Sequence, residues 1–116
     1  MSRSVEQAAR NESTFRRANE SLEEKATDLG LSDEPTPYLC ECEDERCTEI
    51  VRLTSEEYEA VRANPRRFTM VSGHQEADDL LIEEAARFTV IEKNGQEGDL
   101  VAEQDPRSAN ALKKPG

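Results

Sequence analysis

The sequence predicts an α+β fold, with a long N-terminal helix followed by a small domain that contains a short antiparallel sheet and one or two helices. Two patterns support this fold: apolar residues recur at helical spacing near the N-terminus, and short strand-like segments alternate with turn residues after it. Only 34% of the 116 residues are hydrophobic and 35% are charged, so the core is small. A core of that size generally needs a metal, a disulfide or a partner chain to hold it together.

Residues 1–30 are expected to form one long amphipathic helix that ends at Gly30. A helix of this length exceeds what the core of such a small domain requires. It is therefore expected to dock a partner or to pair with a second copy of the chain, or else to pack only its C-terminal half on the domain. The candidate partner-binding face comprises Asn11, Glu12, Phe15, Arg16, Asn19 and Glu20.

A linker over residues 31–37 is expected to separate the helix from a compact domain at residues 38–102. Pro35 and Pro37 disfavour regular helix in the linker. Residues 103–116 show no periodicity and are expected to be a disordered tail.

Within the domain, the clearest local signal marks a helix that begins after Thr54. Thr54 and Glu57 form a capping-box pattern, Leu53 and Tyr58 match a hydrophobic staple, and Pro65 lies past the helix end. Short strands are expected on either side of this helix, at residues 38–42, 49–53, 68–71 and 88–92.

Two further segments have weaker patterns. Residues 77–86 have helical composition, with Leu81 and Ala85 on one face, which predicts a second short helix. Asn94-Gly95 is a favourable hairpin turn, so residues 100–102 are expected to return as an edge strand.

Three cysteines and the single histidine of the chain form a candidate metal site. Cys40, Cys42 and Cys47 have the spacing C-x-C-x4-C, and His74 follows a glycine at the end of a predicted strand. Three thiolates and one imidazole are a recurring ligand set for tetrahedral structural zinc. We therefore expect these four residues to bind a structural zinc ion that stabilises the small domain.

Other interpretations of the cysteines remain open, namely a redox-active thiol cluster and cysteines without a shared role. A carboxylate could also replace His74 as the fourth ligand. The acidic residues near the cysteines are expected to raise the thiol pKa values by like-charge repulsion and to attract a dication, which favours a metal site. The candidate carboxylates are Glu41, Asp44 and Glu49.

The formal net charge of −11 restricts the classes of partner. Nucleic-acid binders usually carry a basic face that neutralises phosphates, and the one basic group here is small. The charge also opposes an anionic membrane surface, and no apolar run reaches the roughly 20 residues that span a bilayer. A protein partner with a basic surface is favoured, and nucleic acid is disfavoured. The basic group consists of Arg62, Arg66 and Arg67, beside Phe68.

The sequence favours a non-catalytic adaptor or regulator over an enzyme. Four protein ligands would leave a zinc ion no open position for water, and no second histidine exists to act as a base. The N-terminus has no hydrophobic signal segment, and clustered thiols without disulfides are typical of a reducing compartment. A cytoplasmic location is therefore expected.

A combined pattern links the helix to the cysteine region. The chain contains Arg10-Asn11-Glu12-x-x-Phe15-Arg16-x-x-Asn19-Glu20, then Leu39-Cys40-Glu41-Cys42, Leu53-Thr54-x-Glu56-Glu57-Tyr58 and Gly73-His74. With this pattern, residues 10–92 resemble a set of small uncharacterised proteins typical of actinobacteria. The resemblance implies an intact Cys/His set and a bacterial cytoplasmic origin, and it supplies no function. Ser72 departs from the proline that precedes Gly-His in that set.

Overall fold

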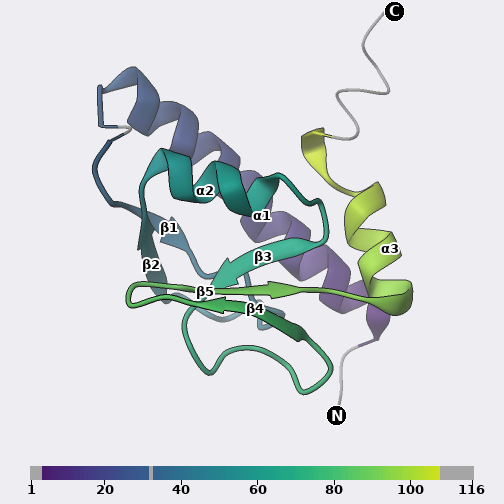
Figure 1. The fold of residues 1–116 in the computed structure, drawn as a ribbon. Coiled ribbons are helices and arrows are strands. Elements are labelled where there is room, and N and C mark those ends of the chain that lie inside the picture. The colour runs from purple at the N-terminus through teal and green to yellow at the C-terminus, as the bar shows by residue number, and fades with distance from the viewer. Residues whose placement is uncertain (1–3, 32, 108–116) are drawn as a thin grey trace, which may run out of the picture.

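The computed structural model describes residues 4–31 and 33–107, and its fold is α+β with a long N-terminal helix, as predicted (Figure 1). The elements in chain order are α1 (Val5–Asp28), β1 (Thr36–Leu39), β2 (Ile50–Leu53), α2 (Ser55–Arg62), β3 (Arg67–Met70), β4 (Leu80–Glu84), β5 (Thr89–Glu92) and α3 (Gly95–Glu103).

The strands form two small antiparallel sheets. β1 pairs with β2, and the second sheet has the order β3-β5-β4. β4 is thus an edge strand, and its register with β5 shifts between Leu81 and Glu83. Ile82 is the extra residue of a bulge at this shift, which locally twists the edge.

Helix α1 begins and ends with well-formed caps. Ser4 caps the N-terminus by accepting a hydrogen bond from the Gln7 backbone N–H at 3.1 Å. At the C-terminus, Gly30 has a φ of 75°, and the Leu31 N–H donates to the Ala26 carbonyl at 2.8 Å. This left-handed glycine ends the helix at the position that the sequence predicts.

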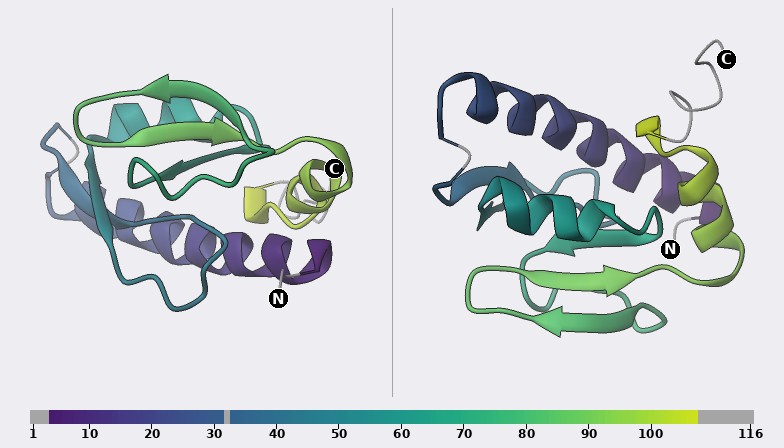
Figure 2. Two further views of the ribbon diagram at one scale, coloured as in Figure 1. Left: turned by 90° about the horizontal axis from the view of Figure 1, so that it is seen from below. Right: turned by 45° about the horizontal axis from the view of Figure 1, so that its top comes forward.

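Helix α1 packs on the rest of the chain along most of its length, because it contacts α3, β1 and α2. In Figure 2, left, α1 lies along one side of the molecule and the β4–β5 hairpin along the opposite side. Ala8 and Ala9, near the N-terminus of α1, are buried. The helix is therefore part of the same packed body as residues 38–102. Among the described residues, no helix combines the length and the apolar character needed to cross a bilayer.

The capping box of α2 forms as predicted. The Glu57 N–H donates to Thr54 Oγ1 at 3.1 Å, and Glu57 Oε1 accepts from the Thr54 N–H at 2.8 Å. Leu53 and Tyr58 are both buried in the core below this turn. The backbone N–H groups of Thr54 and Glu57, which have no acceptor within the helix, are thereby hydrogen-bonded at the junction between β2 and α2.

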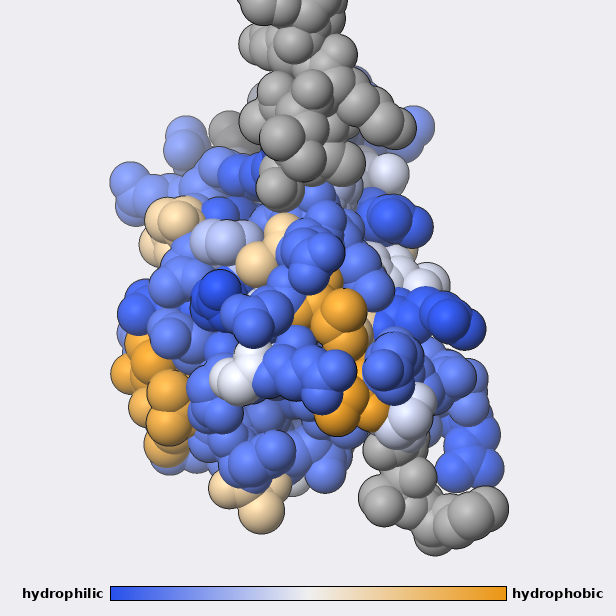
Figure 3. All heavy atoms as spheres, turned by 90° about the vertical axis from the view of Figure 1, so that its right-hand side faces the viewer, coloured by the Kyte–Doolittle hydropathy of each residue, from blue (hydrophilic) through white to orange (hydrophobic). Residues whose placement is uncertain are grey.

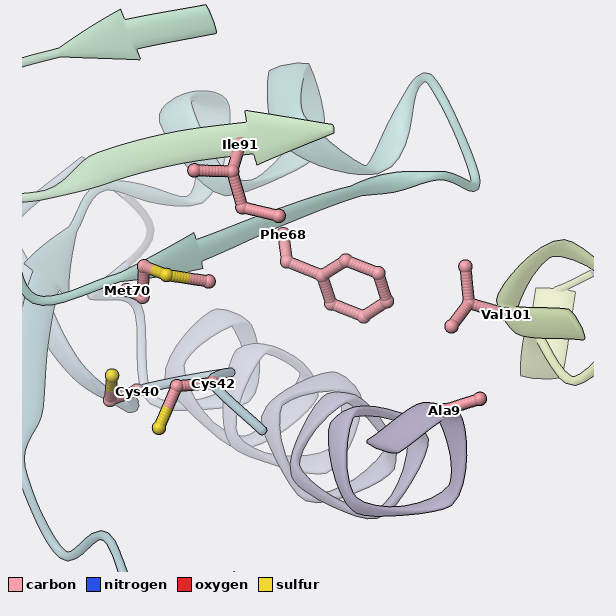
Figure 4. Close-up of a cluster of buried hydrophobic side chains, with 7 residues drawn as sticks. All are labelled: Ala9, Cys40, Cys42, Phe68, Met70, Ile91 and Val101. Atoms are coloured by element: carbon pink, nitrogen blue, oxygen red, sulfur yellow. The ribbon is translucent and has the colours of Figure 1, made fainter. Parts of the chain in front are cut away.

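The core consists of two clusters of buried side chains. In one cluster, the Tyr38 and Tyr58 rings stack with centroids 4.6 Å apart. Figure 4 shows the other cluster, in which Cys40 and Cys42 lie at the opposite end from Val101. The members of this second cluster are Ala9, Cys40, Cys42, Phe68, Met70, Ile91 and Val101.

Two predicted elements differ from the structure. The short helix expected at residues 77–86 is wrong, because residues 80–84 form the strand β4 beside β5. The edge strand expected at residues 100–102 is also wrong, because Asn94 precedes the helix α3 instead of forming a hairpin turn. Pairing with β5 and the burial of Val101 are tertiary effects that outweigh local composition.

The chain stays ordered beyond the predicted domain end at residue 102. Asp105 is buried, and its carboxylate accepts two hydrogen bonds from Arg62. Arg107 forms ion pairs with Glu20 and Glu59. The expected tail at residues 103–116 therefore begins too early, and its remainder at residues 108–116 lies outside the described residues.

Candidate metal centre

The four predicted ligands, Cys40, Cys42, Cys47 and His74, lie together in the structure. Their ligand atoms are all within 4.8 Å of one another. His74 Nδ1 lies 3.4 Å from Cys40 Sγ and 3.7 Å from Cys47 Sγ. Since Zn–S bonds are about 2.3 Å long, the sulfur atoms of a tetrahedral zinc site are roughly 3.8 Å apart. The cluster therefore has the dimensions of a site for one metal ion.

Strand pairing positions the cysteines. Cys40 directly follows β1, and its N–H donates to the Glu49 carbonyl at 3.1 Å, which extends the β1–β2 ladder. The loop then turns back, because the Cys47 N–H donates to the Asp44 carbonyl at 3.0 Å. A tight loop thus returns Cys47 to the two cysteines that precede it.

A backbone hydrogen bond between the C-x-C segment and β3 brings His74 to the cysteines. The Glu41 N–H donates to the Thr69 carbonyl at 2.9 Å, which joins the C-x-C segment to β3. β3 ends at Met70, and a turn follows in which the His74 N–H donates to the Val71 carbonyl at 3.0 Å. Gly73 has a φ of 92° in this turn, a conformation that glycine adopts without strain.

Glu41, which lies between two of the ligands in sequence, faces away from the site. Its carboxylate accepts hydrogen bonds from Asn19 Nδ2 at 2.8 Å, the Tyr58 hydroxyl at 3.0 Å and the Thr69 N–H at 3.1 Å. Burial raises the pKa of Glu41, while nearby Arg16 and these donors act to lower it. Among the described residues, the ligand cluster includes His74 and none of the alternative carboxylates Glu41, Asp44 and Glu49.

The thiols differ in acidity. The Cys40 thiol donates a hydrogen bond that lowers the pKa of Cys42 to about 5, and the same bond, together with burial, raises the pKa of Cys40. Burial raises the pKa of Cys47. The expectation that the pKa of every thiol is raised is therefore wrong for Cys42. The pKa values of Cys40 and Cys47 are raised, mainly by the neighbouring thiol for Cys40 and by burial for Cys47.

The predicted partner-binding face of α1 is turned inward. Asn11, Glu12, Arg16 and Asn19 are buried within the chain itself, and only Phe15 and Glu20 are partly exposed. Asn11 Nδ2 donates to the Glu43 carbonyl at 2.8 Å, next to the cysteine loop. The expectation that this face contacts a partner is wrong for the four buried side chains, because each is enclosed by other parts of the chain.

Arg16 shows why this polar face is buried. It donates to the carbonyls of Pro65 and Arg67, and its guanidinium lies 3.8 Å from the centroid of the Phe68 ring. The side chain thus donates hydrogen bonds to backbone carbonyls at the start of β3, and its guanidinium covers the buried Phe68 ring. In an analysis of sequence periodicity, arginine counts as a polar residue on the surface. No sequence signal therefore indicated that Arg16 is buried against Phe68 and the carbonyls near β3.

The small basic group near β3 is engaged in ion pairs. Arg62 is buried against Asp105 and Glu20, while Arg66 pairs with Asp99 and Arg67 with Glu92. Phe68 is fully buried. These residues therefore do not form a free basic and aromatic surface.

Comparison of the chain with protein-family models, curated proteins and solved structures finds no match. Function is therefore inferred from the chemistry of the site and of the surface around it.

Proposed function

We propose that the chain is a non-catalytic zinc-binding adaptor or regulator that acts through contacts with a protein partner. The Cys₃His cluster is the observation that carries this proposal. Four protein ligands complete a tetrahedral zinc ion and leave no position for a reactive water. Cys40 and Cys42 also belong to a core cluster with Phe68, so an ion bound there stabilises the fold.

The partner surface is proposed at β4 instead of at α1. Leu80, Leu81 and Ile82 are 48%, 52% and 41% exposed on this edge strand. On the face seen in Figure 3, apolar surface is confined to small areas surrounded by hydrophilic residues. Three consecutive exposed aliphatic residues on an edge strand are a recognised feature of interaction sites, because a free edge offers unpaired backbone groups.

The charge around β4 indicates which kind of partner fits. Glu76, Asp78 and Glu83 are exposed and form no ion pair within the described parts of the chain. With a net charge of −11, a second copy would be repelled. The proposed partner is therefore a protein with an extended segment that combines apolar and basic residues and adds to the β4 edge.

The test is capture of partners by the zinc-loaded full chain and by its Leu81→Lys variant, with Ile50→Lys as the matched control. Ile50 is 53% exposed and lies on the other sheet. We expect a basic partner that Leu81→Lys loses and Ile50→Lys retains, with capture that weakens at high salt. Equal capture by both variants would remove β4 from the proposal.

A zinc-linked redox sensor is the second candidate. Cys47 is partly exposed and, with Cys42 and His74, lines an open depression in the surface. Hydrogen peroxide could enter there, oxidise two thiolates to a disulfide and be reduced to water, with release of the ion. Treatment with mild peroxide in the presence of a zinc-sensitive dye tests this candidate. Retention of the ion would leave its role purely structural.

A further inference from the structure

The residues of the candidate metal site differ in their access to solvent. Cys40 and Cys42 are buried, with 1% and 3% of their surface exposed, whereas Cys47 and His74 are partly exposed. A depression of about 460 Å³ opens beside them, and Cys42, Cys47 and His74 contribute to its lining. Cys40 is not among the described residues that line it. A small solute that enters the depression therefore reaches Cys47 first.

The sulfur of Cys40 is held by the fold on the other side. It accepts a hydrogen bond from the Val71 N–H at 3.3 Å, and the Cys40 N–H donates to the Glu49 carbonyl at 3.1 Å. These two bonds fix Cys40 between the end of β1 and the segment that follows β3. Movement of this sulfur toward another cysteine would break its bond with Val71, which costs free energy.

Cys42 and Cys47 lie at the two ends of a short turn of four intervening residues. Within it, the N–H groups of Arg46 and Cys47 both donate to Asp44, at 3.0 Å each. The ligand atoms of the site lie within 4.8 Å of one another, so the sulfur atoms need to approach by less than about 3 Å to form a disulfide. Because both of these bonds are local, the turn can move Cys47 over this distance while β1 stays paired with β2.

We propose that hydrogen peroxide oxidises the zinc-loaded site at Cys47 and that the product is a disulfide between Cys47 and Cys42, with Cys40 left reduced. This pairing rests on the proposed binding of zinc by the Cys₃His cluster. It assigns a separate role to each thiol: Cys47 attacks the peroxide, Cys42 resolves the product, and Cys40 stays bonded to Val71.

The reaction has two steps that balance. The Cys47 thiolate attacks one oxygen of the peroxide, so an S–O bond forms, the O–O bond breaks and hydroxide leaves. The Cys42 thiolate then attacks the sulfenic sulfur of Cys47, so the S–S bond forms, the S–O bond breaks and a second hydroxide leaves. The two thiolates lose two electrons, the peroxide gains them, and both hydroxides take up protons from water. Zinc is released because two of its three thiolate ligands are gone.

The experiment treats the zinc-loaded full chain with a few equivalents of hydrogen peroxide and then alkylates the remaining thiols. Tryptic digestion and tandem mass spectrometry locate the disulfide. Cleavage after Arg46 separates Cys47 from the other two cysteines, so a disulfide to Cys47 joins two peptides. We expect a link between Cys42 and Cys47, an alkylated Cys40, and one zinc ion released per disulfide, measured with a zinc-sensitive dye.

A pair of variants tests which thiol reacts first. Cys47→Ser should consume peroxide more slowly than the wild type by about tenfold or more, because the two remaining thiols are buried. Thr48→Ala, at an exposed neighbouring position, is the control and should react as the wild type does. The map of the wild-type chain decides the pairing even if Cys47→Ser binds zinc poorly.

Three results would overturn the inference while zinc binding itself stands. They are a disulfide that includes Cys40, a wild-type chain that keeps its thiols and its zinc under these conditions, and a zinc-loaded Cys47→Ser variant that reacts as fast as the wild type. A wild-type chain that takes up no zinc would contradict the proposed function, and the pairing with it.

Discussion

Asn19 pairs with Leu39 in the way that a neighbouring β-strand would. Its Nδ2 donates to the Leu39 carbonyl at 2.9 Å, and its Oδ1 accepts from the Leu39 N–H at 2.7 Å. Nδ2 also donates to Glu41 Oε2 at 2.8 Å. One amide on α1 therefore binds the backbone of Leu39 and the carboxylate of Glu41, the two residues that flank Cys40, so the orientation of the candidate metal ligands depends on the helix.

The first prediction follows from this pairing. Asn19→Ala should lower the free energy of unfolding by about 2–4 kcal/mol, because the Leu39 N–H and carbonyl lose a buried partner. Chemical denaturation measures this change, and metal affinity should fall with it. Ser21→Ala, at an exposed position on the same helix, is the control and should match the wild type. Equal stability of the two variants would contradict the role assigned to Asn19.

The second prediction concerns the metal. Purified protein should contain one zinc ion per chain by elemental analysis, and a strong chelator should lower its melting temperature. His74→Ala should weaken zinc binding by more than about tenfold, since even changes beyond the direct ligands commonly cost that much. Thr48→Ala, at an exposed position next to Cys47, is the matched control. Identical melting with and without chelator would exclude a structural metal.

The third prediction concerns Asp105, which anchors the segment after α3. Burial acts to raise the pKa of Asp105, but its hydrogen bonds with Arg62 outweigh that effect and lower the pKa below the ordinary 3.8. The unfolded chain therefore takes up a proton at a higher pH than the folded chain does. The stabilisation is complete above about pH 4 and is lost as the pH falls through the folded-state value.

Asp105→Asn should accordingly destabilise the protein by about 3 kcal/mol at pH 7, because it leaves the buried Arg62 with Glu20 as its one remaining carboxylate partner among the described residues. The variant should also lose part of the fall in stability below pH 4. Denaturation at several pH values measures both effects. Asp99→Asn, on the exposed pair with Arg66, should have little effect. If the stability of Asp105→Asn fell below pH 4 as steeply as that of the wild type, Asp105 would not be the source of this fall.

The fourth prediction concerns Glu12, a buried residue of α1 whose carboxylate lies 2.8 Å from Lys93 Nζ. Burial raises the pKa of Glu12 from its ordinary value of 4.5 to about 10, so the folded state keeps a proton that the unfolded state has released. Stability should therefore fall as the pH rises between these values, by up to roughly 1.4 kcal/mol per unit. Glu12→Gln, which resembles the protonated acid, should match the wild type near pH 5 and exceed it at pH 9. Parallel pH profiles would show that Glu12 is ionised in the folded state.

The segments that were correctly predicted are those in which the deciding contacts are local. The cap of α2 joins Thr54 and Glu57, three residues apart, and the end of α1 depends on Gly30. The three cysteines lie within eight residues of one another, and thiolate chemistry leaves them few roles. The place of His74 beside the cysteines was predictable because it is the only histidine of the chain.

The incorrect predictions depend on partners that lie far apart in the chain. The spacing of residues along α1 could not show that its polar face turns inward. Asn19 donates a hydrogen bond to the Leu39 carbonyl, and Arg16 donates one to the Pro65 carbonyl, and both partners lie far along the chain. Likewise, the strand β4 exists only through its ladder with β5, although its composition favours helix.

By itself, the sequence determined the α+β class, the capped start of α2, the end of α1 at Gly30 and the grouping of Cys40, Cys42, Cys47 and His74, since these follow from spacing, local hydrogen bonds and the chemistry of sulfur. Only the tertiary structure decided which face of α1 is enclosed, that β4 is an exposed edge, and that Lys93 lies against carboxylates from distant segments, namely Glu12, Glu43, Asp79 and Glu97. The physical reason is that burial of a polar group depends on partners from distant segments, and only the folded chain brings those partners together.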